Sequence, residues 1–393
     1  MTVNYENQSR NSLFKDVNLY VIFLVTLIAI MGVSSITPAF PLISQKLGIS
    51  TKQIGLLITV FTLPGVALTL VLGVLADHLG RKRIIVPALF LFAFSGAACG
   101  LVRDFEILLL FRFFQGIGAA PLGALNITMI GDLYDGIRRN TAMGYNASVL
   151  SIGTAIYPVI GGALAASAWY FPFFLPLLAL PVGFAVLFIL KNPEPAPQPH
   201  FIQYLKTIWT YVKNKHMVCL LAANLSLFVI LYGVYLNYIP FLIKDRFEGT
   251  SLEIGLIMSL MSLTTAMVSS QMGRISVRIA ERHLLKAGFF LYGCALMAFI
   301  WVSSFTLIPV PIVIFGLGHG ILIPSIQTMM SRTAPLQYRA GVLSLNGMIL
   351  RLGQTIGPLV MSLVFSVFYI KGVLYGGAMF AFIIFALCVY IWR

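Results

Sequence analysis

Three residues that can carry a positive charge interrupt otherwise apolar stretches of the sequence: Arg112, Arg351 and His319. A histidine titrates near neutral pH and can therefore carry protons. An arginine in an apolar stretch can bind an anionic or hydrogen-bonding substrate group, or can bond backbone carbonyls in a purely structural role. These residue types favour proton coupling or substrate binding, and the structural role stays open for each.

The acidic residues lie elsewhere in the chain. All 12 fall in termini, loops or the ends of apolar stretches: Glu6, Asp16, Asp77, Asp104, Glu106, Asp132, Asp135, Glu194, Asp245, Glu248, Glu253 and Glu281. No carboxylate is placed to balance the two arginines or to give a small cationic substrate a counter-charge. Neutral, amphipathic, zwitterionic or anionic substrates fit better.

The composition restricts the class of protein to which these residues belong. Of the 393 residues, 59% are hydrophobic and 10% are charged, whereas about 25% are charged in soluble domains. A soluble enzyme, a disordered chain and a secreted disulfide module are thereby excluded. The four cysteines lie far apart in apolar stretches and form no C-x-x-C pair, so we expect no metal site, no disulfide framework and no cofactor.

The apolar stretches predict twelve membrane-spanning helices, because a bilayer needs about 20 apolar residues per helix. Their expected limits are 18–40, 53–76, 84–102, 106–130, 142–165, 170–190, 217–242, 254–273, 285–304, 307–329, 341–368 and 372–392. With both termini cytoplasmic, 18 of the 26 Lys and Arg residues lie on the cytoplasmic side, 6 on the other side and 2 within spans. This bias follows the positive-inside rule, so the net charge of +14 indicates orientation in the lipid bilayer and not nucleic acid binding.

A polar, proline-rich segment divides the chain into two sets of six spans. We expect a six-helix bundle over 1–190, a cytoplasmic linker over 191–216 and a second bundle over 217–393. Within the linker, Phe201, Leu205, Ile208 and Val212 recur at helical spacing and predict an amphipathic helix on the membrane surface.

The two halves repeat at an offset of 200 residues. Gly116 and Gly118 match Gly316 and Gly318, while further matches pair 54–56 with 254–256, 73 with 273, 128–129 with 328–329, 139 with 339, and 146, 153 and 158 with 346, 353 and 358. Two parallel six-helix repeats around a central cavity are a transporter architecture. We therefore predict an all-α polytopic membrane protein with twelve transmembrane helices in two pseudo-symmetric bundles.

The loop after the second span carries a motif of specific spacing, G-x-L-x-D-x-x-G-R-K-R, at residues 73–83. It resembles the signature loop of the major facilitator superfamily. The resemblance implies a conformational latch made of Gly73, Asp77, Gly80, Arg81 and Asp132. Asp77 would meet the start of the eleventh span near Arg339 in the outward-open state, whereas a basic loop that only sets topology is the alternative. The second copy has Val277 where the first has the acid.

Two further motifs extend the resemblance over essentially the whole chain. Residues 112–116 read R-x-x-Q-G, and in the family this arginine is linked to proton transfer. A helix-packing motif typical of exporters and proton antiporters matches at Gly153, Pro158, Gly161, Gly162, Gly353, Gly357 and Pro358. Tyr157 departs from it, since the family has glycine there. The chain resembles the twelve-span drug:proton antiporter group.

Polar and aromatic side chains within the spans are candidates for lining the substrate cavity: Gln115, Asn126, Asn146, Tyr157, Asn224, Tyr232, Tyr235, Asn237, Tyr238, Gln327, Asn346 and Gln354. The predicted function is proton-coupled efflux of small amphipathic or hydrophobic compounds by alternating access. An importer or uniporter of a sugar, peptide or organic acid, or a lipid flippase, is the alternative. The sequence has no P-loop, which disfavours ATP-driven transport. It has no Ser–His or His–Asp set within the spans, which disfavours a membrane enzyme. We expect a monomer in a bacterial cytoplasmic membrane.

Overall fold

Long helices account for the regular structure of the described chain, which comprises residues 13, 16–191, 214–333 and 339–392 of the computed structural model. The described part of the first half contains the elements α2 (Val17–Ser34), η1 (Thr37–Ala39), α3 (Phe40–Leu47), α4 (Thr51–Ile54), α5 (Leu56–Leu79), α6 (Arg81–Leu101), α7 (Phe105–Ala119), α8 (Leu122–Leu133), α9 (Gly136–Ser167), η2 (Phe171–Leu178) and α10 (Ala179–Phe188). The second half contains α12 (Lys215–Ile230), η3 (Leu231–Tyr235), α13 (Leu236–Phe247), α14 (Ser251–Arg278), α15 (Glu281–Trp301), η4 (Phe305–Leu307), α16 (Pro309–Thr333) and α17 (Arg339–Ile391).

Eleven helical segments of the described chain are long and apolar enough to cross a membrane. The last of them, α17, has 53 residues and would be about 80 Å long as one straight helix, more than twice the roughly 30 Å of a bilayer core. It is interrupted at Tyr369, whose φ is 54° and ψ is −162°. The eleventh and twelfth predicted spans therefore lie on either side of Tyr369, and the prediction of an all-α polytopic membrane protein is confirmed.

The helices overrun the predicted span limits. The apolar stretch predicted over 142–165 is part of α9, which covers Gly136–Ser167, and the stretch over 254–273 is part of α14, which covers Ser251–Arg278. Hydropathy marks only the part of a helix that lies in hydrocarbon, whereas the polar ends continue the same backbone hydrogen bonding beyond it.

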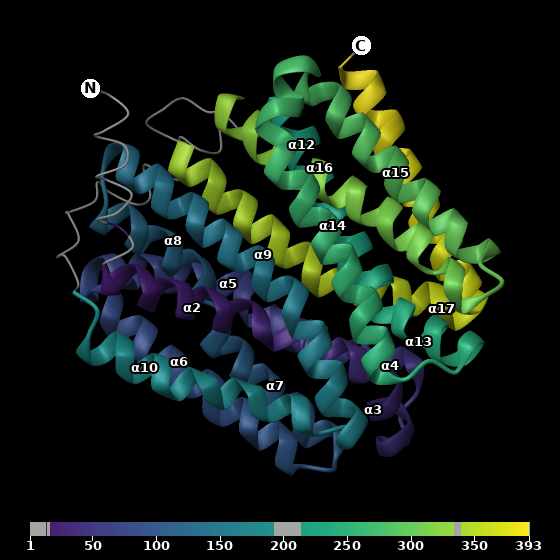
Figure 1. Ribbon diagram of the computed structural model, residues 1–393, viewed down its shortest axis with the longest axis horizontal. Helices are drawn as coiled ribbons and strands as arrows, with labels where there is room; N and C mark the ends of the chain where they lie inside the picture. Colours follow the sequence, from purple (N-terminus) through teal and green to yellow (C-terminus); the bar gives the residue numbers. More distant parts are fainter. Residues whose placement is uncertain (1–12, 14–15, 192–213, 334–338, 393) are drawn as a thin grey trace.

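Buried apolar side chains form two separate cores, one in each half. The first contains residues from Leu13 to Leu190, and the second contains residues from Met217 to Cys388. Phe241 is the exception, because it belongs to the second half of the chain and packs in the first core. The most extensive contacts between the halves join α9 with α14 and α5 with α17, and Figure 1 shows α9 and α14 running side by side.

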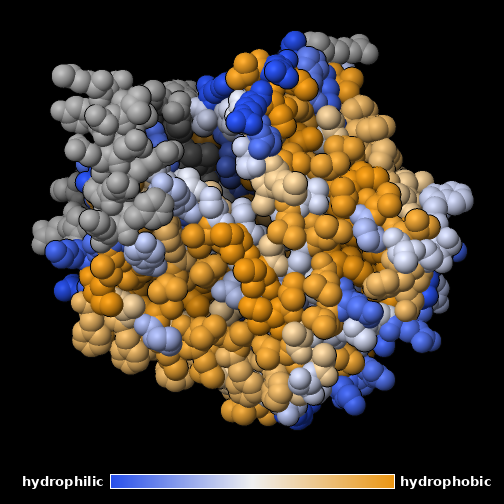
Figure 2. All heavy atoms as spheres, viewed as in Figure 1, coloured by the Kyte–Doolittle hydropathy of each residue, from blue (hydrophilic) through white to orange (hydrophobic). Residues whose placement is uncertain are grey.

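The outer surface is apolar around the middle of the bundle, as Figure 2 shows. Phe188, Met267 and Leu363 are more than 70% exposed, which suits contact with lipid tails rather than water. Both chain termini lie at the upper edge of Figure 1. We call this the termini end of the bundle, and the opposite side the far end. The amphipathic helix predicted for 201–212 lies outside the described residues, so the linker and its limits stay a prediction.

Candidate functional site

Arg112 is sealed inside the first half. Its side chain is fully buried and donates to two backbone carbonyls, Leu57 O at 3.1 Å and Gly32 O at 2.9 Å. It also donates to Gln115 Oε1 at 2.6 Å, and its guanidinium lies 4.2 Å from the ring centroid of Phe61. Arg112 thus ties α7 to α2 and α5. This is the arrangement expected if the arginine has a purely structural role. Its part in proton transfer stays a prediction.

A second polar cluster joins three helices of the first half. Thr26 of α2 donates to Asn146 Oδ1 of α9 at 2.5 Å and accepts a hydrogen bond from Asn126 of α8. At the positions 200 residues further on, Ser226 donates to Ala222 O at 2.7 Å, and Asn346 O accepts from Asn224 at 3.1 Å. The side chains of these residues are buried. The first set joins α2, α8 and α9, and the bond of Asn224 joins α12 to α17, whereas the bond of Ser226 lies within α12.

His319 belongs to an aromatic stack in the second half. Its Nδ1 lies 2.5 Å from the hydroxyl of Tyr292. The Tyr292 ring stacks on Phe315 at 4.0 Å between centroids, and Phe315 stacks on Tyr235 at 4.8 Å. His319 is 7% exposed. This contact fixes the orientation of the imidazole, and no pattern in the sequence identifies Tyr292 as its partner.

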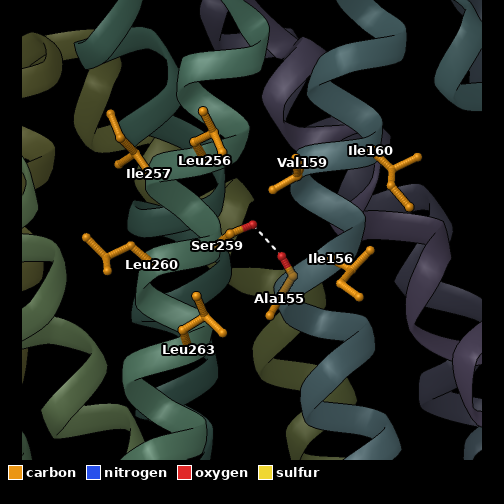
Figure 3. Close-up of a pocket in the computed structure, with 9 residues that line it drawn as sticks. All are labelled: Ala155, Ile156, Val159, Ile160, Leu256, Ile257, Ser259, Leu260 and Leu263. Carbon is orange, nitrogen blue, oxygen red and sulfur yellow. Dashed lines mark hydrogen bonds between the residues drawn. The ribbon is translucent and has the colours of Figure 1, made fainter.

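The seam between the halves is held by two hydrogen bonds that obey the 200-residue offset. Thr59 of α5 donates to Thr355 O of α17 at 3.0 Å, and Ser259 of α14 donates to Ala155 O of α9. Position 259 follows 59 by 200 residues, as 355 follows 155. Figure 3 shows the second bond at the bottom of an apolar groove. The groove lies between α9 and α14, and exposed apolar side chains such as Ile156 and Leu263 line it, so we expect lipid tails to fill it.

Glycines bring the backbones of the two halves together toward the far end. A β-carbon at Gly255 would overlap Pro158 O, and one at Gly162 would overlap Ser251 O. A β-carbon at Gly55 would lie 3.1 Å from Cβ of Pro358 and 2.9 Å from Nδ2 of Asn237. Close approach of backbones requires glycine at positions 162 and 255, of which Gly162 belongs to the helix-packing motif. Gly153 and Gly161 instead face α2 and Ser35 within the first half, and Gly353 and Gly357 face α12 in the second.

The same four helices separate toward the termini end. No described atom lies within 4 Å of a β-carbon placed at Gly73, Gly144, Gly273 or Gly347. The helices are therefore not closely packed at these glycines in this conformation. The halves meet at the far end and leave a central cleft that opens at the termini end.

Arg351 lies in this central cleft, near the middle of the part of α17 that precedes Tyr369. A β-carbon at Gly65 of α5 would lie 3.3 Å from Cδ of Arg351, and one at Gly123 of α8 would lie 3.8 Å from its Nη2. The side chain therefore reaches from the second half to the first. Its Nη1 donates to Gln354 Oε1 at 3.2 Å, and Tyr232 of η3 packs against both cores beside it.

The other predicted cavity residues lie outside this group. Tyr235, Asn237 and Tyr238 are fully buried, and Tyr238 stacks on Phe365 at 5.1 Å. Tyr157 is buried in the first core and Gln327 is exposed on α16. The cleft thus brings together Arg351, Gln354 and Tyr232 of the predicted set. Reasoning from sequence missed Gly65 and Gly123, because a glycine facing an arginine leaves no pattern in either segment.

The predicted latch is present in part. Gly80 has a φ of 96°, which requires glycine at the turn between α5 and α6. Arg81 Nε lies 3.0 Å from Asp132 Oδ2. The side chains of Asp77 and Arg339 lie outside the described set, so the contact of Asp77 with the eleventh span stays a prediction. Nearby, between α8 and α9, burial and the hydrogen bond to Asp16 raise the pKa of Tyr134 above its usual range.

The second half carries the same ion pair with its charges reversed. Glu281 and Arg332 stand 200 residues after Arg81 and Asp132, and they form an ion pair of 2.9 Å. The side chain of Arg81 is 6% exposed and that of Asp132 is 27% exposed, whereas Arg332 is 69% exposed. Each pair ties the start of one helix to the end of another within its own half, so both halves are fixed at the termini end in the same way.

We expect Asp132→Asn to destabilise the protein more than its counterpart Glu281→Gln. The first change removes a carboxylate from a buried guanidinium and should cost about 2 kcal/mol. The second weakens an ion pair with an exposed arginine and should cost about 0.5 kcal/mol. Thermal melting of the two variants in one detergent measures the difference. Equal melting temperatures would show that burial of Arg81 does not set the strength of its pair.

Comparison with known proteins agrees with this architecture. Residues 22–305 and 230–393 match the family model of the Major Facilitator Superfamily. The bacillibactin exporter of Bacillus subtilis is 23% identical to this chain, over 89% of the chain and 90% of the relative. Multidrug resistance protein 1 of the same organism is 24% identical over 90% and 91%. The multidrug resistance efflux pump PmrA of Streptococcus pneumoniae is 25% identical over 92% of each protein.

Solved structures share the fold. A bacterial homologue of the human lysosomal transporter Spinster superimposes with a TM-score of 0.81 at 18% identity, over 96% of this chain and 97% of the other. The nucleoside transporter NupG superimposes with a TM-score of 0.79 at 13% identity, over 96% and 98%. With two six-helix halves around a central cleft and a family match along nearly its full length, the chain belongs to the Major Facilitator Superfamily.

Proposed function

We propose that this transporter exports small amphipathic or hydrophobic compounds by alternating access, in exchange for protons. As a member of its family it is an integral membrane transporter and not an enzyme. The observation that carries the proposal is the central cleft, closed at the far end and open at the termini end. The relatives named as an exporter and as multidrug resistance proteins support the direction of transport.

The orientation in the membrane follows from the distribution of charge. Because most Lys and Arg residues lie in the loops at the termini end, this end faces the cytoplasm. The cleft is then inward-open and takes up its substrate from the cytoplasm or the inner leaflet. We propose a bacterial cytoplasmic membrane as the location and a monomer as the working unit, since the two halves of one chain enclose the cleft.

Proton exchange needs a titratable group inside the bundle. Arg112 is held by carbonyls and Arg351 lies in the central cleft, whereas His319 is the one of the three candidates with an imidazole, a group that can take up and release a proton. Its contact with the Tyr292 hydroxyl at 2.5 Å holds the ring in place. We propose that His319, positioned by Tyr292, carries the proton that is exchanged for substrate.

Reconstituted vesicles test this proposal. With a pH gradient imposed, an amphipathic fluorescent probe should accumulate in the more acidic compartment, because protons leaving that compartment drive substrate into it. An uncoupler that collapses the gradient should abolish accumulation. His319→Gln should keep exchange of probe for probe while losing gradient-driven accumulation. Transport that proceeds only down the probe's own gradient would contradict proton coupling and favour a uniporter.

A further inference from the structure

We propose that Arg351 is an anion-binding point of the central cleft, and that the substrates are amphipathic molecules carrying one anionic oxygen group, a carboxylate or a phosphate. This inference rests on the proposed function and narrows its substrate class. The anionic group could belong to a soluble organic acid or to the headgroup of an anionic lipid. Both present the same chemistry to a guanidinium, which binds planar anions through paired N–H donors.

The position of Arg351 is that of a ligand-binding group. Its stem passes Gly65 of α5 and its Nη2 faces Gly123 of α8, so the guanidinium lies between the halves and not within one of them. At both positions the absence of a side chain leaves room around the arginine. Placing a charged group near the middle of a span costs free energy, so a charged side chain that faces a cleft there indicates a functional site.

The charge of Arg351 has no counter-charge in the described part of the chain. Its hydrogen bond goes to the neutral carboxamide of Gln354 at 3.2 Å. The ion pairs of the described residues join Arg81 to Asp132, Arg139 to Asp135 and Arg332 to Glu281. The acidic side chains that the structure describes lie at helix ends or in loops, so none of these is placed near the middle of the cleft.

Arg112 shows what a structural arginine looks like in the same protein. It is fully buried, with two backbone carbonyls, the Gln115 carboxamide and the Phe61 ring around it. Arg351 is half-buried, and among the described contacts it has one of these three kinds of partner. Nη2 of Arg112 has no hydrogen-bond partner among the described residues, but it is sealed inside the first half, whereas the guanidinium of Arg351 lies between the halves, where a ligand can reach it.

Closure of the cleft makes the ligand's charge matter. While the cleft is open, water reaches Arg351. When the halves close over it, the guanidinium loses that water, and a buried charge without a partner is costly. A bound anion removes this penalty, so the loaded transporter closes more readily than the empty one. The apolar part of the substrate would lie against Tyr232 and Leu236, which pack on both cores.

Binding of two matched probes tests the inference without any gradient. We would measure pyrenebutyrate and the pyrenebutyl trimethylammonium cation, which share a ring system and differ in charge, by fluorescence in phosphatidylcholine nanodiscs. The wild-type protein should bind the anion about tenfold more tightly than the cation. Arg351→Gln should abolish this preference. Arg246→Gln removes the same charge at the far end, where Arg246 faces Phe247, and should leave it unchanged.

A second pair of variants keeps the inference testable if Arg351→Gln fails to fold. Gly123→Asp supplies a carboxylate from the opposite helix, close to Nη2 of Arg351, and should compete with the probe and weaken anion binding about tenfold. Gly123→Asn has nearly the same shape without the charge, so the difference in anion affinity between the two variants measures the effect of the carboxylate alone. Equal anion affinities for the Asp and Asn variants would overturn the inference.

The lipid arm separates the two sources of the anionic group. If lipid headgroups occupy the site, adding phosphatidylglycerol to the nanodiscs should weaken the binding of pyrenebutyrate to the wild type. The residual binding of pyrenebutyrate to Arg351→Gln should then stay unchanged. An unchanged affinity assigns the site to soluble organic anions. Because binding is read without a gradient, an anion preference that is absent from the wild type, or that persists in Arg351→Gln, overturns this inference alone. Absence of gradient-driven flux overturns only the proposed proton coupling.

Discussion

Arg112→Ala is expected to lower the thermal stability of the protein, and transport with it. The change removes hydrogen bonds to Gly32 O, Leu57 O and Gln115 Oε1 and leaves a cavity the size of an arginine side chain. At about 1 kcal/mol for each hydrogen bond, together with the cavity, the loss should reach about 4 kcal/mol. Thermal melting of the purified variant measures it.

Two companion variants separate stability from transport in this prediction. Arg112→Lys keeps the charge, but a single ammonium cannot span two carbonyls on different helices and the Gln115 side chain. It should therefore recover only part of the lost melting temperature. Arg351→Gln serves as the comparison, because Arg351 holds no backbone carbonyl among the described contacts and should lose much less stability. An Arg112→Ala protein that melts like the wild type and yet transports nothing would restore the role of Arg112 in proton transfer.

The helices and the two halves could be predicted from the sequence because the signals are local or periodic. Long apolar stretches fix the spans, and the offset of 200 residues links positions such as 59 and 259. The same offset relates the hydrogen bonds of Thr59 and Ser259 across the seam. The offset also relates two ion pairs in which the acidic and basic positions are exchanged. A search for identical residues overlooks such a relation. A comparison of charge and hydrogen-bonding capacity at this offset would have found both.

The candidate site could be predicted only in part, since Arg112 and Arg351 look alike in the sequence. Each is an arginine followed three residues later by glutamine, Gln115 and Gln354, inside an apolar stretch. What separates them is the packing of other helices. Backbone carbonyls of α2 and α5 reach Arg112, while two glycines of the opposite half face Arg351. Contacts between helices distant in sequence decide which polar groups are satisfied, and local pattern does not record them.

Gly255→Val is expected to abolish transport by preventing closure of the far end. A β-carbon at position 255 of α14 would overlap the carbonyl of Pro158 on α9, and a backbone atom cannot move aside as a flexible side chain can. The two helices must separate there, which opens the hydrogen bond between Ser259 and Ala155 O one turn away. A steric penalty of about 3 kcal/mol would reduce the inward-open population by roughly 100-fold relative to the outward-open state.

Gly273→Val on the same helix is the matched control. No described atom lies within 4 Å of a β-carbon at position 273, so the larger side chain has room while the cleft is open. Spin-label distances between the halves at the far end should lengthen in Gly255→Val and should not lengthen in Gly273→Val. If the cleft closes as alternating access requires, the second variant should instead be impaired in reaching the outward-open state, where α14 approaches the first half at its termini end. The two substitutions would then shift the equilibrium in opposite directions from one helix, and a shift in the same direction would contradict rocking of the halves about the centre of the bundle.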